Sequence, residues 1–193
     1  MRDATRPGGR ADAQRNRQRL IEIALEAFSS GRNPVTLEAI AKASGVGIGT
    51  LYRHFPSREA LIEAVYRSEL ARLCDGTVGL LAEMAPEVAL RTWMARYADF
   101  VTTKRGMAEA LRAVVASGAL TFAQTRERLS AAIQTMLDAG VSAGSLRGDV
   151  RADDVVASLA GILLAAGEPD QREQSDRMLD LLMEGLRPRN TEP

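Results

Sequence analysis

The chain has 193 residues, of which 46% are hydrophobic and only 4% aromatic, and its formal net charge is zero. This length and apolar content allow one large domain, or a small and a medium one, with a well-formed core. No segment alternates between apolar and polar residues as a strand does, so the sequence predicts an all-α fold. No stretch approaches the ~18 apolar residues of a membrane-spanning helix, and we therefore expect no membrane partner.

The charge is distributed unevenly along the chain. Residues 1–58 contain ten Lys/Arg against five Asp/Glu, a net charge of +5, whereas residues 59–193 contain fifteen against twenty, a net charge of −5. A basic N-terminal part attracts nucleic-acid phosphate regardless of sequence, and an acidic remainder is repelled by it. The pattern predicts a DNA-binding part followed by a part with a different task.

The N-terminus and the cysteine usage indicate the compartment. Residues 1–11 include Pro7-Gly8-Gly9 and are expected to form a flexible arm, whose arginines either enter a DNA minor groove or belong to a plain tail. The arm lacks the apolar segment of a secretory signal. Cys74 is the single cysteine, so the chain cannot form an intramolecular disulfide. It is either a buried inert thiol or a redox sensor. We expect a cytoplasmic protein.

Residues 35–55 read V-T-L-E-A-I-A-K-A-S-G-V-G-I-G-T-L-Y-R-H-F and predict two short helices separated by a glycine turn. Thr36 is a good N-cap, and Glu38 places negative charge in the first turn. The first helix then runs from Leu37 to about Ser44, and Gly45 ends it in the left-handed conformation that glycine tolerates best. The second helix covers roughly residues 47–55. This arrangement is a helix-turn-helix.

The second short helix has an apolar and a polar side. At 100° per residue, Leu51 and Phe55 share the inner side, while Gly49 and Arg53 lie opposite. Ile48 is ambiguous, since it either packs inward or touches a thymine methyl group.

The polar side suits a DNA major groove. Gly49 allows close approach of the backbone, Thr50 can bond a base edge or a phosphate, and Arg53 can fork onto guanine or phosphate. We expect Tyr52 and His54 to contact phosphate rather than bases.

The segments T-L-E-A-I-A-K-A-S-G-V, G-T-L-Y-R-H-F and S-R-E-A-L closely resemble the DNA-binding domain of the tetracycline-repressor (TetR) family of bacterial transcription regulators. The resemblance covers about Arg15 to Tyr66. Where the family often has serine and then a polar residue at the start of the recognition helix, this chain has Gly47 and Ile48. The resemblance implies DNA contacts by Thr36, Gly47, Ile48, Gly49, Thr50, Tyr52, Arg53, His54 and Arg15.

The remaining helices are expected from their caps, breaks and apolar spacing. A first long helix begins at Asp12 and ends before Gly31, and a weak break falls at residues 76–79. Asp153 is expected to cap a helix that ends at Ala166, and Gly140, Gly144 and Gly148 to loosen the chain before it. The other expected helices cover residues 58–74, 86–104, 107–117, 121–139 and 171–186. We therefore divide the chain into an arm (1–11), a helix-turn-helix domain (12–57), a helical effector-binding and dimerisation domain (58–187) and a tail (188–193).

The resemblance also implies an effector pocket and a homodimer. Each candidate pocket residue is either core or a ligand contact; the candidates are Trp93, Tyr97, Phe100, Met107, Leu111, Val114, Phe122 and Met136. In the family the last two helices of each subunit form a four-helix interface about a two-fold axis. Here the candidates for that interface are Val155, Leu159, Ile162, Leu163, Met178, Leu181 and Leu182. A two-fold dimer presents its recognition helices roughly 34–36 Å apart or at a larger spacing, so the operator should be an inverted repeat.

Catalysis and metal binding have little support in the sequence. The chain has one histidine, His54, which lies in the recognition helix, so we expect no metal site, no catalytic triad and no cofactor. The sequence predicts a homodimeric repressor that binds double-stranded DNA and is released from it by an unknown small-molecule effector. The alternative is a helical protein that binds a small molecule or a partner and has lost specific DNA readout. An α-helical enzyme is a third possibility, without an identifiable triad.

Overall fold

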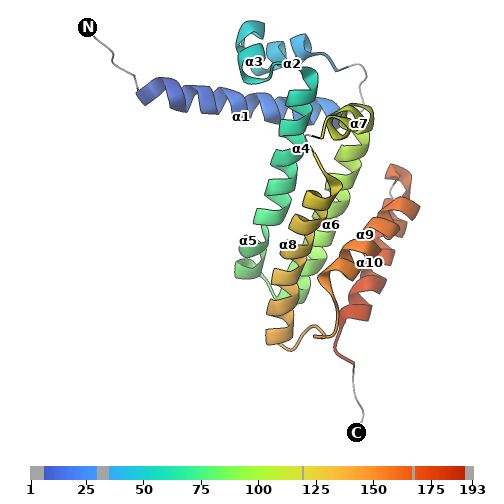
Figure 1. The fold of residues 1–193 in the computed structure, drawn as a ribbon. Coiled ribbons are helices and arrows are strands. Elements are labelled where there is room, and N and C mark those ends of the chain that lie inside the picture. Colours follow the sequence, from blue (N-terminus) through green and yellow to red (C-terminus); the bar gives the residue numbers. More distant parts are fainter. Residues whose placement is uncertain (1–6, 30–34, 119, 167, 190–193) are drawn as a thin grey trace. The chain divides into compact units, whose positions relative to one another are not determined.

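The computed structural model describes residues 7–29, 35–118, 120–166 and 168–189, and in these ranges every regular element is a helix (Figure 1). The expected all-α fold is confirmed. The chain divides into two compact units, one of Met1–Ser68 with Thr103–Leu120 and one of Glu69–Thr102 with Thr121–Pro193. The units interleave along the sequence, because two long helices each contribute residues to both. Among the described residues, no helix is long and apolar enough to cross a membrane.

The first unit contains the predicted helix-turn-helix. Its elements are α1 (Pro7–Ser29), α2 (Leu37–Ser44), α3 (Ile48–His54), the first part of α4 (Arg58–Asp75), the end of α6 (Pro86–Gly106) and α7 (Ala108–Ala116). Helix α1 packs against both α2 and α3, and α2 packs against α3. The apolar stripe of α1, with Leu20, Ala24 and Phe28, is buried.

The second unit is a helical body. It contains the rest of α4 and α6 together with α5 (Thr77–Glu83), α8 (Phe122–Ser142), α9 (Ala152–Ala165), the 3-10 helix η1 (Pro169–Gln171) and α10 (Arg172–Leu186). Helix α8 packs against α5 and α9, and α9 packs against α10. Trp93 is fully buried, and its indole N–H donates to the Leu73 carbonyl oxygen at 2.9 Å.

Several predicted boundaries are wrong by a few residues. Helix α1 begins at Pro7 rather than at Asp12, so residues 7–11 of the expected arm are helical; residues 1–6 lie outside the described ranges. The weak break after Gly76 is followed by a helix of its own, α5. Of the expected tail, residues 190–193 also lie outside the described ranges.

The expected cap of α9 is wrong in detail. Arg151 occupies the N-cap position, and Asp153 lies in the first turn. Asp153 instead accepts a hydrogen bond from the Ser130 hydroxyl at 2.5 Å, and Arg126 lies 3.7 Å from its carboxylate. The Ser130 hydrogen bond is the main cause that lowers the pKa of Asp153. A long-range partner on α8 has replaced the local capping role.

An ion-pair network joins α6 to α10 within the second unit. Arg91 contacts Asp180 at 2.6 Å and Asp176 at 3.3 Å, while Arg172 contacts Asp99 at 2.6 Å and Asp176 at 3.7 Å. Asp176 is shared by both arginines, so the charges alternate along the two helices. Networks of this kind fix geometry better than isolated surface pairs do. The network holds the last helix in a defined position on α6.

Candidate functional site

Helix α2 is fixed at both ends by local capping. The Thr36 hydroxyl accepts a hydrogen bond from the Ala39 N–H at 3.2 Å, as expected of an N-cap. At the other end Gly45 has φ 67° and ψ 20°, the left-handed conformation predicted for it, and its N–H bonds to the Lys42 carbonyl at 3.2 Å. This sharp end lets the chain turn within three residues into α3.

The inner face of α3 is buried as the helical wheel predicts. Leu51 is 0% exposed and Phe55, which follows the helix, is 2% exposed. The first turn of α3 is closed by the Gly47 carbonyl oxygen, which accepts hydrogen bonds from the N–H groups of Thr50 and Leu51 at 2.8 and 3.1 Å. Gly47 makes no side-chain cap bond. The packing of Leu51 and Phe55 therefore orients the helix.

The outer face of α3 carries the residues expected to contact DNA. Gly49 and Arg53 are exposed, Tyr52 is 45% exposed, and Thr50 and His54 are half-buried at the flanks. The structure also shows that Ile48 does not pack fully inward, because 40% of its surface is exposed. The helix I-G-T-L-Y-R-H has no acidic residue, and two basic residues occupy its last turn. Its outer face is thus compatible with a polyanion.

An arginine of α1 is fixed beside α3. The Arg17 guanidinium lies 5.2 Å from the centre of the Phe55 ring, within the range of a cation–π contact. In the same unit, the Arg58 guanidinium lies 5.9 Å from the Phe28 ring. Arg15, which the sequence selects as a phosphate contact, forms an exposed ion pair with Asp12. The contact of Arg17 with Phe55 joins residues 38 positions apart, so no local sequence pattern could show it.

The predicted effector residues are distributed over both units. Trp93, Tyr97, Phe100 and Met136 are buried in the second unit, and Met107, Leu111 and Val114 are buried in the first. The Trp93 and Tyr97 rings are stacked with centroids 5.8 Å apart, and the Phe100 ring lies 6.3 Å from that of Tyr97. Phe122 differs from the others, because 61% of its surface is exposed. That these eight residues line a ligand pocket stays a prediction.

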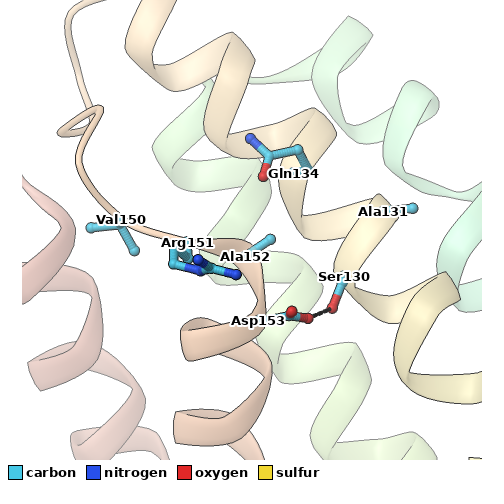
Figure 2. A pocket seen from close by; sticks show the side chains of 7 residues that line it. All are labelled: Ser130, Ala131, Gln134, Val150, Arg151, Ala152 and Asp153. Carbon is cyan, nitrogen blue, oxygen red and sulfur yellow. Dashed lines mark hydrogen bonds between the residues drawn. The ribbon is translucent and has the colours of Figure 1, made fainter. Parts of the chain in front are cut away.

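A surface pocket of about 430 Å³ lies between α8 and the start of α9, lined by Ser130, Ala131, Gln134, Val150, Arg151, Ala152 and Asp153. Figure 2 shows the Ser130–Asp153 hydrogen bond among the residues that line this pocket, Gln134 and Arg151 included. A second pocket of about 400 Å³ adjoins α6 and α10 and includes Glu87, Arg91 and Asp180. Both pockets have charged linings, and neither includes a predicted effector residue.

The predicted dimer residues fall on opposite faces of the last two helices. Val155, Leu159 and Leu163 are 1%, 1% and 3% exposed and belong to the core of the subunit. Ile162, Met178 and Leu182 are half-buried, and Leu181 is 72% exposed. The sequence analysis did not select Leu164 for the interface, and the structure shows that 83% of its surface is exposed. It lies seven residues after Ala157 and three after Gly161, a helical spacing that could have indicated a second face.

No group of three or more His, Cys, Asp or Glu in the described ranges is placed to hold a metal ion. Cys74 is buried, and this burial raises the pKa of its thiol.

Comparison with known proteins adds an independent observation. Residues 20–65 match the family model for bacterial regulatory proteins of the tetR family, and residues 85–188 match the model for the C-terminal domain of SbtR-like transcriptional regulators. An HTH-type transcriptional regulator of Staphylococcus aureus strain USA300 is 44% identical over 62 residues, which are 32% of this chain. The match spans only about a third (34%) of the length of that curated relative.

Solved structures resemble the chain over most of its length. A TetR transcriptional regulator from Streptomyces coelicolor is 51% identical, with a TM-score of 0.81, and the match covers 89% of this chain and 98% of that one. A TetR regulatory protein from Mycobacterium vanbaalenii is 31% identical, with a TM-score of 0.73 and coverage of 93% and 99%. The likeness therefore extends beyond the helix-turn-helix into the helical body.

Proposed function

Because this chain belongs to the TetR family of transcriptional regulators, we propose that it is a homodimeric repressor, which binds an inverted-repeat operator and is released by a small-molecule effector. The observation that carries the proposal is the orientation of α3. Leu51 and Phe55 on its inner side are buried, while Thr50, Tyr52 and Arg53 remain available on the outer side or its flank. A short helix oriented in this way can enter a major groove.

Arg53 is the proposed base or phosphate contact, and Arg17, held on the Phe55 ring, is the proposed phosphate contact beside it. The other proposed DNA contacts rest on the sequence pattern and the family resemblance; they are Thr36, Gly47, Gly49, Thr50, Tyr52, His54 and Arg15. Phosphate contacts fix the register of a protein on DNA, whereas base contacts select the sequence. Loss of Arg17 should therefore weaken all DNA about equally, and loss of Arg53 should weaken the operator most if the fork lies on a base.

The proposed dimer interface is the outer face of α9 and α10. It centres on the exposed Leu164 and Leu181, with the half-buried Ile162, Met178 and Leu182 at its margins, since the other predicted residues are used within the subunit. Leu164 and Leu181, on neighbouring helices, are 83% and 72% exposed. Covering this apolar surface with another surface would be favourable, because it removes the two side chains from water. A second copy related by a two-fold axis provides that surface.

The interface is tested by adding a charge to it. Leu164→Glu should give a monomer in sedimentation velocity at micromolar concentration, because an unpaired carboxylate would be buried in the four-helix contact. Val78→Glu is the matched control, since Val78 is 70% exposed on α5, outside the proposed interface. A Leu164→Glu protein that remains dimeric would exclude this face as the interface.

We further propose that the effector binds in the C-terminal domain and displaces the apolar side chains around Trp93, Tyr97 and Met136. A ligand releases the repressor only to the extent that it binds better to the state with misaligned recognition helices. This role involves binding without catalysis, and we place it in the cytoplasm, where the DNA is.

The direct test of DNA binding is selection of genomic fragments by the purified full-length protein at two salt concentrations. Enrichment of one inverted repeat at the higher salt is the expected result, because base contacts persist while counterion-driven binding declines. Arg53→Ala should cost about 1–3 kcal/mol of operator binding if the arginine forks onto a base. Arg112→Ala is the control, since this exposed arginine lies on α7. Fragments bound only at low salt and without a shared motif would instead indicate a protein that has lost specific readout.

A further inference from the structure

The first unit exposes two large apolar side chains in its described residues, and both lie on α3. Ile48 is 40% exposed and Tyr52 is 45% exposed, one helical turn apart. Every other exposed large hydrophobic side chain of the described chain belongs to the second unit. Leu51 and Phe55 are buried on the inner side of α3, whereas 40% of the surface of Ile48 remains accessible.

The space beside the two glycines that flank Ile48 is open. A Cβ atom added to either flanking glycine, Gly47 or Gly49, would meet no other atom within 4 Å. Neither glycine has a side chain that could donate or accept a hydrogen bond. The first turn of α3 therefore presents one apolar side chain without polar neighbours on either side in the sequence.

The charge of α3 indicates what kind of partner binds its exposed side. The helix has no acidic residue, Arg53 and His54 are in its last turn, and the Arg17 guanidinium is fixed beside Phe55. An exposed apolar residue on a helix that carries basic and no acidic residues suits the major groove better than an apolar protein surface. In that groove the protruding apolar group is the C5-methyl of thymine, and cytosine and the purines lack it.

We propose that Ile48 reads the C5-methyl group of a thymine in each operator half-site. The inference rests on the proposed function, because it names a base feature that the DNA-binding surface selects. Burial of one methyl-sized group corresponds to about a fourfold change in affinity. A dimer that makes the contact in both half-sites gains about 15-fold by the same reasoning.

Deoxyuridine tests the contact directly, because it pairs as thymine does and lacks only the methyl group. Each thymine of the selected operator is replaced by deoxyuridine at the same position of both half-sites, and affinity is measured by fluorescence anisotropy. The full-length protein is compared with Ile48→Ala and with the conservative variant Ile48→Val. Circular dichroism melting verifies that the variants are folded, as expected for changes at an exposed position.

At one thymine position, replacement by deoxyuridine in both half-sites should weaken the affinity of the unaltered protein about 15-fold. The loss should persist with Ile48→Val and disappear with Ile48→Ala. A second measurement needs no variant: at that position 5-methylcytosine should bind more tightly than cytosine.

The inference is overturned if Ile48→Ala is as sensitive to deoxyuridine as the unaltered protein at every position, or if the half-site contains no thymine. In both cases an enriched inverted repeat would leave the proposed regulator function intact. If no repeat is enriched at all, the proposed function fails and this inference fails with it.

Discussion

Gly140 is a position where one added methyl group should destabilise the fold. It lies in the last turns of α8 and is buried, and a Cβ atom built on it would lie 2.5 Å from the Leu146 Cγ and 2.9 Å from the Leu146 Cβ. The Gly140 carbonyl also accepts from the N–H groups of Ser145 and Leu146 at 2.9 and 3.1 Å. The chain after α8 thus folds back directly onto this glycine. The sequence reading of Gly140 as a loosening point is wrong, because the residue allows a close contact.

The net effect of Gly140→Ala combines two opposing terms. Alanine in place of a helical glycine gains about 1 kcal/mol. Overpacking against a buried side chain costs about 1–3 kcal/mol, and more when the neighbour cannot move. Leu146 is 3% exposed, and its Cβ is fixed by the backbone, so a rotamer change alone does not clear the clash. We expect a net loss of about 1–2 kcal/mol, or about 3–6 °C in melting temperature for a chain of this size.

Thermal and urea unfolding of three single variants and one double variant measure the effect. Gly79→Ala is the control, because Gly79 lies in α5 and a Cβ added there would meet nothing within 4 Å, so this variant should be slightly stabilised. Leu146→Ala removes the Cγ and Cδ atoms but keeps the Cβ at 2.9 Å, so Gly140→Ala should be less destabilising in that background without becoming neutral. If Gly140→Ala behaves as Gly79→Ala does, the close contact carries no energetic weight and the reasoning is refuted.

Three further outcomes follow from individual contacts. Thr36→Ala should cost about 1 kcal/mol of stability through the lost N-cap bond to Ala39, with Thr36→Ser as the conservative control in urea unfolding. The hydrogen bond from Arg147 is the main cause that lowers the pKa of Asp149 to about 2. A carboxyl whose pKa is lowered on folding stabilises the protein above its unfolded value of 3.8, and this contribution is lost as the pH falls from about 4 to 2. NMR titration should therefore give a midpoint near 2 for Asp149, and Arg147→Gln should return it toward 3.8. The buried Cys74 thiol, with its raised pKa, should react with a thiol reagent only after unfolding, and rapid labelling of the native protein would contradict its burial.

The sequence determined the features that depend on neighbours a few residues apart. The Thr36 cap, the left-handed Gly45 and the inward side of α3 at Leu51 and Phe55 were all predictable. Each follows from backbone sterics, a local hydrogen bond or a helical period. These local signals were sufficient to indicate a helix-turn-helix, and the residue order within it indicated the family.

Only the tertiary structure decided which face of each body helix is inside. Leu163 and Leu164 are adjacent and equally apolar, yet the first is 3% exposed and the second 83% exposed. Their difference depends on where α8 and α10 contact α9, and that contact depends on residues far away in the sequence. The sequence was equally undecided about Ile48, and only the packing of α3 in the fold leaves 40% of its surface exposed. Composition shows how much apolar surface a helix has, whereas the packing of distant elements determines which part of it remains available for DNA, ligand or a second subunit.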